Sequence, residues 1–171
     1  VIAIILVALF LRDRLSNVKG VLEAFAYGGL FIVDFLATAS VVVPLPGAVA
    51  VVFAGSVLSP ILVGLVAGVA EALGESVGYL LGFSGRGIVE NRQFYQRAAG
   101  WLRRRGWLVL LIFAAIPNPA FDVVGIAAGA LRFPFWRFLL FVWVGKTIKS
   151  LGLAYAGYYG MSSLLRWFQI G

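Results

Sequence analysis

The sequence contains neither cysteine nor histidine, and only 7 of its 171 residues are acidic. Without cysteine the chain cannot form disulfides, thiolate zinc sites or thiol nucleophiles. Without histidine it also lacks the commonest general base and the commonest metal-ligating side chain. We therefore expect no catalytic residues, no metal site and no cofactor, and we predict that the protein is not an enzyme.

Charged residues of both signs are scarce as well, at 12% of the chain, against about 25% in ordinary soluble domains. Hydrophobic residues make up 62%, and the mean hydropathy is +1.01. In lipid every backbone polar group must be satisfied internally, and the sequence shows no sustained alternation of the kind that barrel strands need. The composition predicts an all-α integral membrane protein with a single transmembrane domain over residues 1–171.

The 14 basic residues outnumber the acidic ones and give a net charge of +7. In this apolar context basic residues set topology and contact anionic head groups, so we predict membrane lipids as partners and no nucleic acid. Assembly into a homo-oligomer stays open. Residues 1–11 are apolar but too short to span a bilayer. We interpret them as a truncated span or a terminal anchor that ends at a polar break over residues 12–20.

Two clusters of proline interrupt the later apolar stretches. Proline lacks a backbone donor and restricts the residue before it, so a regular helix cannot continue through such a cluster. Each cluster is followed by an apolar piece of about half a span, residues 48–58 or 120–133, and then by a long apolar stretch. We interpret the clusters as the breaks of re-entrant helical hairpins. The breaks are formed by Pro44, Pro46, Gly47, Pro117 and Pro119.

The order of these pieces occurs twice, which indicates an internal repeat. Residues 21–83 form the first repeat and residues 107–160 the second, and the long stretches begin at Pro60 and Pro134. One full crossing in each unit places the second unit upside down relative to the first. Inverted repeats with broken helices are typical of transporters.

Residues 84–106 link the two repeats and contain six arginines against one acid, Glu90. Aromatic and apolar residues recur within the linker at helical spacing, which favours an amphipathic helix at the head-group level over an ordinary charged loop. Because basic loops stay on the cytoplasmic side, we predict that this basic linker is cytoplasmic.

The stretch that begins at Pro60 contains two carboxylates, Glu71 and Glu75, four residues apart. Together with four glycines they form one small and polar stripe of a helix, which does not suit a lipid-facing surface. The stripe consists of Gly64, Gly68, Glu71, Glu75, Gly78 and Gly82.

The second repeat places Lys146 and Lys149 at nearly the same distance from Pro134 as the acids are from Pro60. Lys149 shares a stripe with Gly145, Gly152 and Ala156, so we expect the two helices to pack small face to small face and to pair acids with lysines. An unpaired charge at the bilayer centre costs about 3 kcal/mol. The pairs either fix the register of the helices, or contain an acid that titrates or exchanges partners during transport.

Two further acids lie near the breaks. Asp122, close to Asn118 and to the second break, is a candidate for the substrate or proton path, because half-helix ends coordinate ions and polar groups. Its alternative role is the N-cap of the following half-helix. Asp34 is expected to snorkel or to act as a cap.

Several of these motifs resemble the DedA family, also called the VTT or SNARE-associated domain, over roughly residues 31–160. The resemblance lies in the run from Gly74 through Glu75, Gly78, Tyr79 and Gly82 to Gly85, in PLPG at 44–47, in the second break, in AAG at 127–129 and in FPFWRF at 133–138. It implies two facing re-entrant helices, movement of lipids such as phospholipids or polyprenyl phosphates, coupling to the proton motive force, and a bacterial cytoplasmic membrane location.

Some motif positions differ from the family pattern. Many bacterial members have acids at the positions of Ala39 and Ala48, and arginines at the positions of Ala114 and Ala120. Of the family acids, Glu75 alone is matched. Arginine is the natural ligand of phosphate, so the resemblance does not extend to specificity for polyprenyl phosphate.

The sequence therefore predicts a flippase or scramblase with a charged groove within the membrane. The alternatives are a proton- or ion-coupled transporter of a small solute, and a structural module without transport. Three arginines are expected at the interface, as lipid head-group contacts or as topology anchors: Arg86, Arg132 and Arg137.

Overall fold

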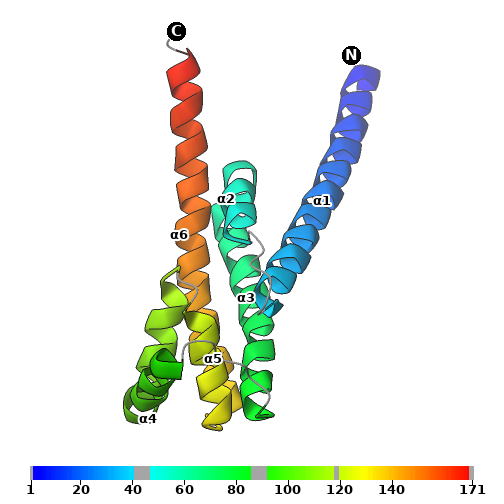
Figure 1. The fold of residues 1–171 in the computed structure, drawn as a ribbon. Helices are drawn as coiled ribbons and strands as arrows, with labels where there is room; N and C mark the ends of the chain where they lie inside the picture. The colour runs from blue at the N-terminus through cyan, green and yellow to red at the C-terminus, as the bar shows by residue number, and fades with distance from the viewer. Residues whose placement is uncertain (1, 41–46, 86–91, 118–119, 170–171) are drawn as a thin grey trace.

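The computed structural model describes residues 2–40, 47–85, 92–117 and 120–169. Within these ranges the chain forms six helices and no strand (Figure 1). The helices are α1 (Ile2–Ala39), α2 (Gly47–Val57), α3 (Pro60–Phe83), α4 (Arg92–Ala115), α5 (Phe121–Ala130) and α6 (Phe135–Gln169). The prediction of an all-helical chain is confirmed.

Three helical segments of the described chain are long and apolar enough to cross a membrane: Gly20–Ala39, Pro60–Phe83 and Phe135–Ser163. The apolar helices α2 and α5 have 11 and 10 residues, which is too short to span. Both start close to the positions at which the sequence predicted half-spans. Each follows a predicted proline break, and each is followed by one of the long helices.

One predicted boundary is wrong. The polar residues 12–20 do not interrupt the chain, because α1 continues through them from Ile2 to Ala39. This stretch lacks proline, and four of its nine residues are arginine, leucine or lysine, which are good helix formers, so its polarity does not end the helix. At the other end, α6 continues to Gln169, and its apolar part ends at Ser163, close to residue 160.

The part of the basic linker from Arg92 onwards and the apolar residues after it form a single kinked element, α4. Arg105 has non-helical backbone angles, φ −146° and ψ 60°, next to the boundary that the sequence predicted at residue 106. Before the kink α4 is amphipathic: Ala98 and Leu102 are buried, whereas Arg97 and Arg103 are exposed.

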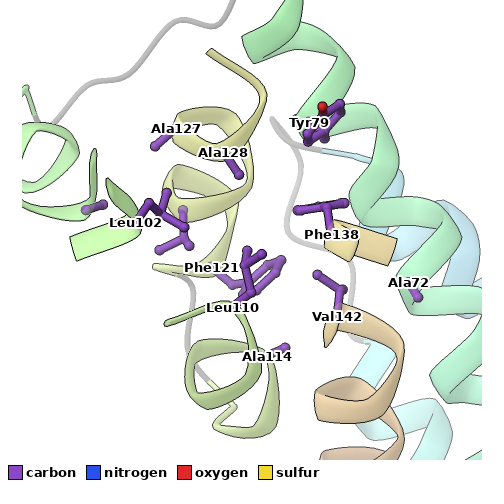
Figure 2. Close-up of a cluster of buried hydrophobic side chains, with 12 residues drawn as sticks. Ala72, Tyr79, Leu102, Leu110, Ala114, Phe121, Ala127, Ala128, Phe138 and Val142 are labelled. Carbon is purple, nitrogen blue, oxygen red and sulfur yellow. The ribbon is translucent and has the colours of Figure 1, made fainter. Parts of the chain in front are cut away.

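The antiparallel helices α3 and α6 pack along each other at the centre of the molecule (Figure 1). Helix α1 packs on α3, and α4 packs on α6. The short helices cross over: α2, which precedes α3, packs mainly on α6, whereas α5, which precedes α6, packs on α3. Figure 2 shows part of the core, in which Leu110, Phe121, Phe138 and Val142 gather between α4, α5 and α6.

Reciprocal glycine contacts hold each short helix against its long partner. A Cβ atom on Gly55 of α2 would collide with the backbone of Ala154 of α6, and one on Gly157 of α6 would collide with the carbonyl oxygen of Val52. Only glycine allows two helix backbones to approach so closely.

The same arrangement occurs between α3 and α5. A Cβ atom on Gly82 would collide with the carbonyl oxygen of Ile126, and one on Gly129 would collide with that of Tyr79. In all four cases the glycine lies three residues after the carbonyl that its counterpart approaches. The two short helices are therefore docked in equivalent ways.

Candidate functional site

The small and polar stripe of α3 faces the protein, as the sequence predicted. All six of its residues are buried. Gly64 and Gly68 give room to Leu151 and Thr147 of α6, since a Cβ atom on either glycine would overlap these side chains. The close approach brings the two glutamates of the stripe against α6.

Two lysines of α6 reach these glutamates. Lys146 donates a hydrogen bond to Glu75, with 2.5 Å between Nζ and Oε1, and its Nζ is 3.6 Å from Glu71 Oε2. Lys149 pairs with the same Oε2 atom of Glu71. Ser150 donates a hydrogen bond of 2.7 Å to the other oxygen, Glu71 Oε1. None of the four charged side chains is more than 13% exposed, so the predicted pairing is present inside the protein.

Asp34 of α1 belongs to the same region, although the sequence indicated only a capping or snorkelling role. Its side chain is 1% exposed and interacts electrostatically with Glu71 and Lys149. Oδ1 faces the first residue of α2, because a Cβ atom on Gly47 would lie 2.7 Å from it. Oδ2 has no hydrogen-bond partner among the described residues. Asp34 is far from the other acids in the sequence, so no local spacing predicted that it would lie near Glu71.

Asp122 approaches the ion pairs from α5. It interacts electrostatically with Lys146 and Glu75. Phe121 places its ring 4.8 Å from the Nζ of Lys146, a cation–π distance. The second oxygen of Glu75 faces Gly125, where a Cβ atom would be 4.0 Å away. The first turns of α2 and α5 thus lie at the two ends of one set of charges.

We call this set the polar cluster: Asp34, Glu71, Glu75, Asp122, Lys146, Lys149 and Ser150. It contains four carboxyl groups and two amines. The described residues around it hold no group of acidic side chains with metal-binding geometry.

Several predicted features need correction. The N-cap of α5 is Ala120, and Asp122 lies in the first turn without a capping hydrogen bond, so the predicted N-cap role is wrong.

Of the residues predicted to form the breaks, Gly47 begins α2, and Pro117 follows the end of α4. Five predicted site residues lie outside the described residues: Pro44, Pro46, Arg86, Asn118 and Pro119.

The predicted small face of α6 is also wrong. Gly145 packs against α4, near the carbonyl oxygen of Leu111, and not against α3. Gly152 and Ala156 are exposed. Helix α6 has α2, α3 and α4 as neighbours, and spacing along one helix does not say which neighbour takes which face.

Two of the three predicted head-group arginines, Arg132 and Arg137, lie at or next to the α5–α6 connection. Arg132 has a positive φ of 53° and follows α5, and its guanidinium carbon is 5.4 Å from the ring centroid of Phe83. Arg137 is exposed in the first turn of α6. Both are available to solvent or lipid at one end of the helix pair.

A comparison with protein-family models matches the VTT domain to residues 45–159, more than half of the chain. The chain belongs to the VTT domain family. The match runs from the start of α2 almost to the end of the apolar part of α6, so it contains most of the polar cluster. It confirms the family resemblance that the motifs around Glu75 indicated.

Curated relatives of this VTT domain are eukaryotic vacuole membrane proteins. The vacuole membrane protein 1 homolog of Dictyostelium discoideum is 33% identical over 63 residues, which are 37% of this chain and 15% of that protein. Vacuole membrane protein KMS2 of Arabidopsis thaliana is 45% identical over 42 residues, 25% of this chain and 10% of that protein. Vacuole membrane protein 1 of Homo sapiens is 40% identical over 50 residues, which are 29% of this chain and 12% of that protein.

The matched segments therefore span between 10% and 15% of these relatives. No solved structure matches the chain. The family, the three apolar helices and the relatives together identify an integral membrane protein.

Proposed function

We propose that this VTT domain moves lipids across the bilayer as a flippase or scramblase, with the polar cluster as the path of the lipid head group. The observation that carries the proposal is the position of the cluster. Glu71 and Glu75 of α3 form ion pairs with Lys146 and Lys149 of α6 inside the protein, and both helices qualify as membrane spans. Asp34 of α1 and Asp122 of α5 approach these pairs from either side. Ionisable groups inside a membrane are costly and mark substrate or ion pathways.

In the proposed architecture, α2 and α5 are re-entrant helices of two inverted repeats, residues 21–83 and 107–160. The reciprocal glycine contacts support this reading, because α2 packs on α6 in the way that α5 packs on α3. Each short helix begins at the polar cluster. Half-helices that end at a common site near the bilayer centre are a feature of transporters built from inverted repeats.

The chemistry of the cluster favours a head group that contains an ammonium group. Both lysines are already paired with glutamates, and arginine is absent from the cluster. Oδ2 of Asp34 has no partner among the described residues, so an acceptor is available. We therefore favour zwitterionic phospholipids over polyprenyl phosphates as the substrate of this chain.

We further propose that the arginine-rich end of the molecule faces the cytoplasm. The first half of α4 and the α5–α6 connection lie at the same end (Figure 1). Six exposed arginines of the described chain belong to these segments: Arg97, Arg103, Arg104, Arg105, Arg132 and Arg137. Basic segments remain on the cytoplasmic side and bind anionic lipids. A location in the bacterial cytoplasmic membrane stays a prediction from the family resemblance.

Reconstitution in liposomes with fluorescent phospholipids tests the proposal. Dithionite bleaches only label in the outer leaflet, so we expect the wild-type chain to expose inner-leaflet lipids to bleaching. With Glu75→Gln a smaller fraction of the labelled lipids should be bleached. The exposed control Gln93→Glu, outside the polar cluster, should behave as wild type. Wild-type vesicles that move neither zwitterionic nor anionic lipids would refute lipid translocation.

A second candidate function is proton- or ion-coupled transport of a small solute. The excess of carboxyl groups over amines favours it, because two of the four acids have no lysine of their own. A flux that depends on pH and is abolished by Glu75→Gln, with unchanged lipid movement, would favour this function over lipid translocation.

We also propose that the protein is not an enzyme and that its partners are membrane lipids.

A purely structural role makes a different prediction from either transport function. Neutral replacement of Glu71, Glu75, Lys146 and Lys149 would then leave lipid movement and solute flux unaltered as long as the fold persists.

A further inference from the structure

An apolar groove runs along the outer side of the α3–α6 pair, next to the polar cluster. It has a volume of about 260 Å³ and almost no polar lining. Val69, Ala72 and Leu73 of α3 form one wall. Ala72 is 2% exposed and forms the floor, whereas Val69 and Leu73 are 40% exposed and form the rim.

Helix α6 supplies the opposite wall, which contains two tryptophans, Trp136 and Trp143, and two leucines, Leu139 and Leu140. Trp136 in the first turn of α6 is 78% exposed, and Trp143 two turns further is 38% exposed. The groove is therefore open at the start of α6 and more enclosed farther along the helix. Seven residues of helix correspond to about 10 Å.

The surroundings of the groove indicate its occupant. Both walls belong to helices that qualify as membrane spans, so the rim faces hydrocarbon and not water. The open end lies at the arginine-rich end of the molecule, where Arg137 follows Trp136 and is exposed. Tryptophan and arginine residues are typical of the membrane–water interface, the depth at which lipid phosphates lie.

We propose that this groove binds one acyl chain of a phospholipid, with the phosphate of that lipid held at Arg137 and Trp136. This inference deepens the proposed lipid translocation and rests on it. The groove holds the lipid before its head group enters the polar cluster.

The sequence places the groove and the cluster on adjacent faces of the same helical segments. Ala72 directly follows Glu71, and Trp143 lies one helical turn before Lys146. A lipid whose chain occupies the groove therefore has its head group at the membrane surface and its tail beside the ion pairs.

Photolabelling of the full chain in liposomes tests the groove. The probe is phosphatidylethanolamine with a diazirine in one acyl chain, mixed into phosphatidylethanolamine and phosphatidylglycerol vesicles. We expect the label to concentrate on residues 69–73 and 136–143, relative to Val49 and Phe53 of α2, which are equally apolar and 66% exposed.

A filling variant, Leu73→Trp, should reduce labelling of the groove. Loss of contact with about two methylene groups corresponds to a decrease on the order of tenfold in occupancy. The matched control, Leu62→Trp, places the same side chain on an exposed position of α3 outside the groove and should leave the label unchanged. Arg137→Gln should weaken labelling by probes with an anionic head group more than by zwitterionic ones.

Lipid movement measured in the same vesicles separates the two proposals. Labelling spread evenly over all exposed apolar residues, with lipid movement intact, would overturn the groove and leave the function standing. Absence of lipid movement in the wild type would overturn the function, and with it the role of the groove. Cross-links between two copies at Trp136 or Leu140, without lipid label, would overturn the groove in favour of a dimer contact.

Discussion

Lys146 and Glu75 form a hydrogen-bonded ion pair across the α3–α6 interface, with 2.5 Å between Nζ and Oε1 and neither side chain more than 8% exposed. The same lysine also lies 3.6 Å from Glu71. Removal of one residue therefore has different consequences for the other, because only one of the two has a second partner of opposite charge nearby. Glu75 depends on Lys146, whereas Lys146 has a second glutamate.

This asymmetry makes a prediction about single substitutions. Lys146→Met leaves the buried Glu75 carboxylate without its partner and should lower stability by about 3–5 kcal/mol. Glu75→Gln should have a smaller effect, because Lys146 keeps Glu71. Thermal unfolding in detergent, followed by size-exclusion fluorescence, measures both. Equal losses for the two variants would contradict the asymmetry.

The double variant Glu75→Lys with Lys146→Glu tests what the pair does. Exchange of the two residues restores opposite charges within the pair but places a carboxylate at position 146 near Glu71, so we expect only part of the stability lost in the single variants to return. If lipid movement returns as well, the pair fixes the register of the helices. If stability returns without lipid movement, the position of the carboxylate matters for transport.

The reciprocal glycines make a prediction about helix docking. Gly82→Ala and Gly157→Ala place a Cβ atom against a backbone carbonyl, and overpacking of this kind typically costs about 1–3 kcal/mol. The matched controls are Gly78→Ala on α3 and Gly152→Ala on α6, where a Cβ atom meets nothing within 4 Å. These should be neutral or stabilising by up to about 1 kcal/mol, because alanine favours helix more than glycine does.

The outcome is read from the melting temperature of the four purified variants. A similar decrease for all four would indicate that the glycines matter for a reason other than close approach. Similar losses for Gly82→Ala and Gly157→Ala would support the equivalence of the two short helices.

Asp34 is predicted to tolerate neutralisation. Asp34→Asn keeps the shape of the side chain and removes a carboxylate that has one unsatisfied oxygen and lies near Glu71. We expect stability to be kept or increased, because a neutral amide is less costly to bury than a carboxylate and the repulsion from Glu71 is removed. Asp34→Ala, which also removes the contact with the start of α2, should be destabilised. Equal destabilisation of both variants would show that the charge itself is required by the fold.

Tyr79 connects α3 to the segment between α5 and α6. Its hydroxyl donates a hydrogen bond of 2.5 Å to the carbonyl oxygen of Phe133, and its ring packs on Phe135 and Phe138. Tyr79→Phe keeps the ring and removes the hydrogen bond, so we expect a loss of about 0.5–1.5 kcal/mol. Tyr79→Ala should cost several times more, because the packing is lost as well. Unfolding in detergent compares the two, and a null effect of Tyr79→Phe would exclude an energetic role for this bond.

The sequence by itself determined the class of the protein and much of the pairing in the polar cluster. A composition with 62% hydrophobic residues requires a membrane protein, and prolines mark where helices must stop. The spacing of Glu71 and Glu75 placed both on one helix face, and the cost of an unpaired charge in lipid predicted that Lys146 and Lys149 would face them.

The tertiary structure decided which faces of the helices meet. The stripe predicted on α3 was correct because it holds both charged residues and four of the five glycines of that helix. Helix α6 has three neighbours, and its small residues are divided among them. Asp34 joined the cluster only through the packing of α1 on α3. The crossing of α2 onto α6 and of α5 onto α3 depends on close backbone contacts between residues far apart in the chain, which the local periodicity of a sequence does not encode.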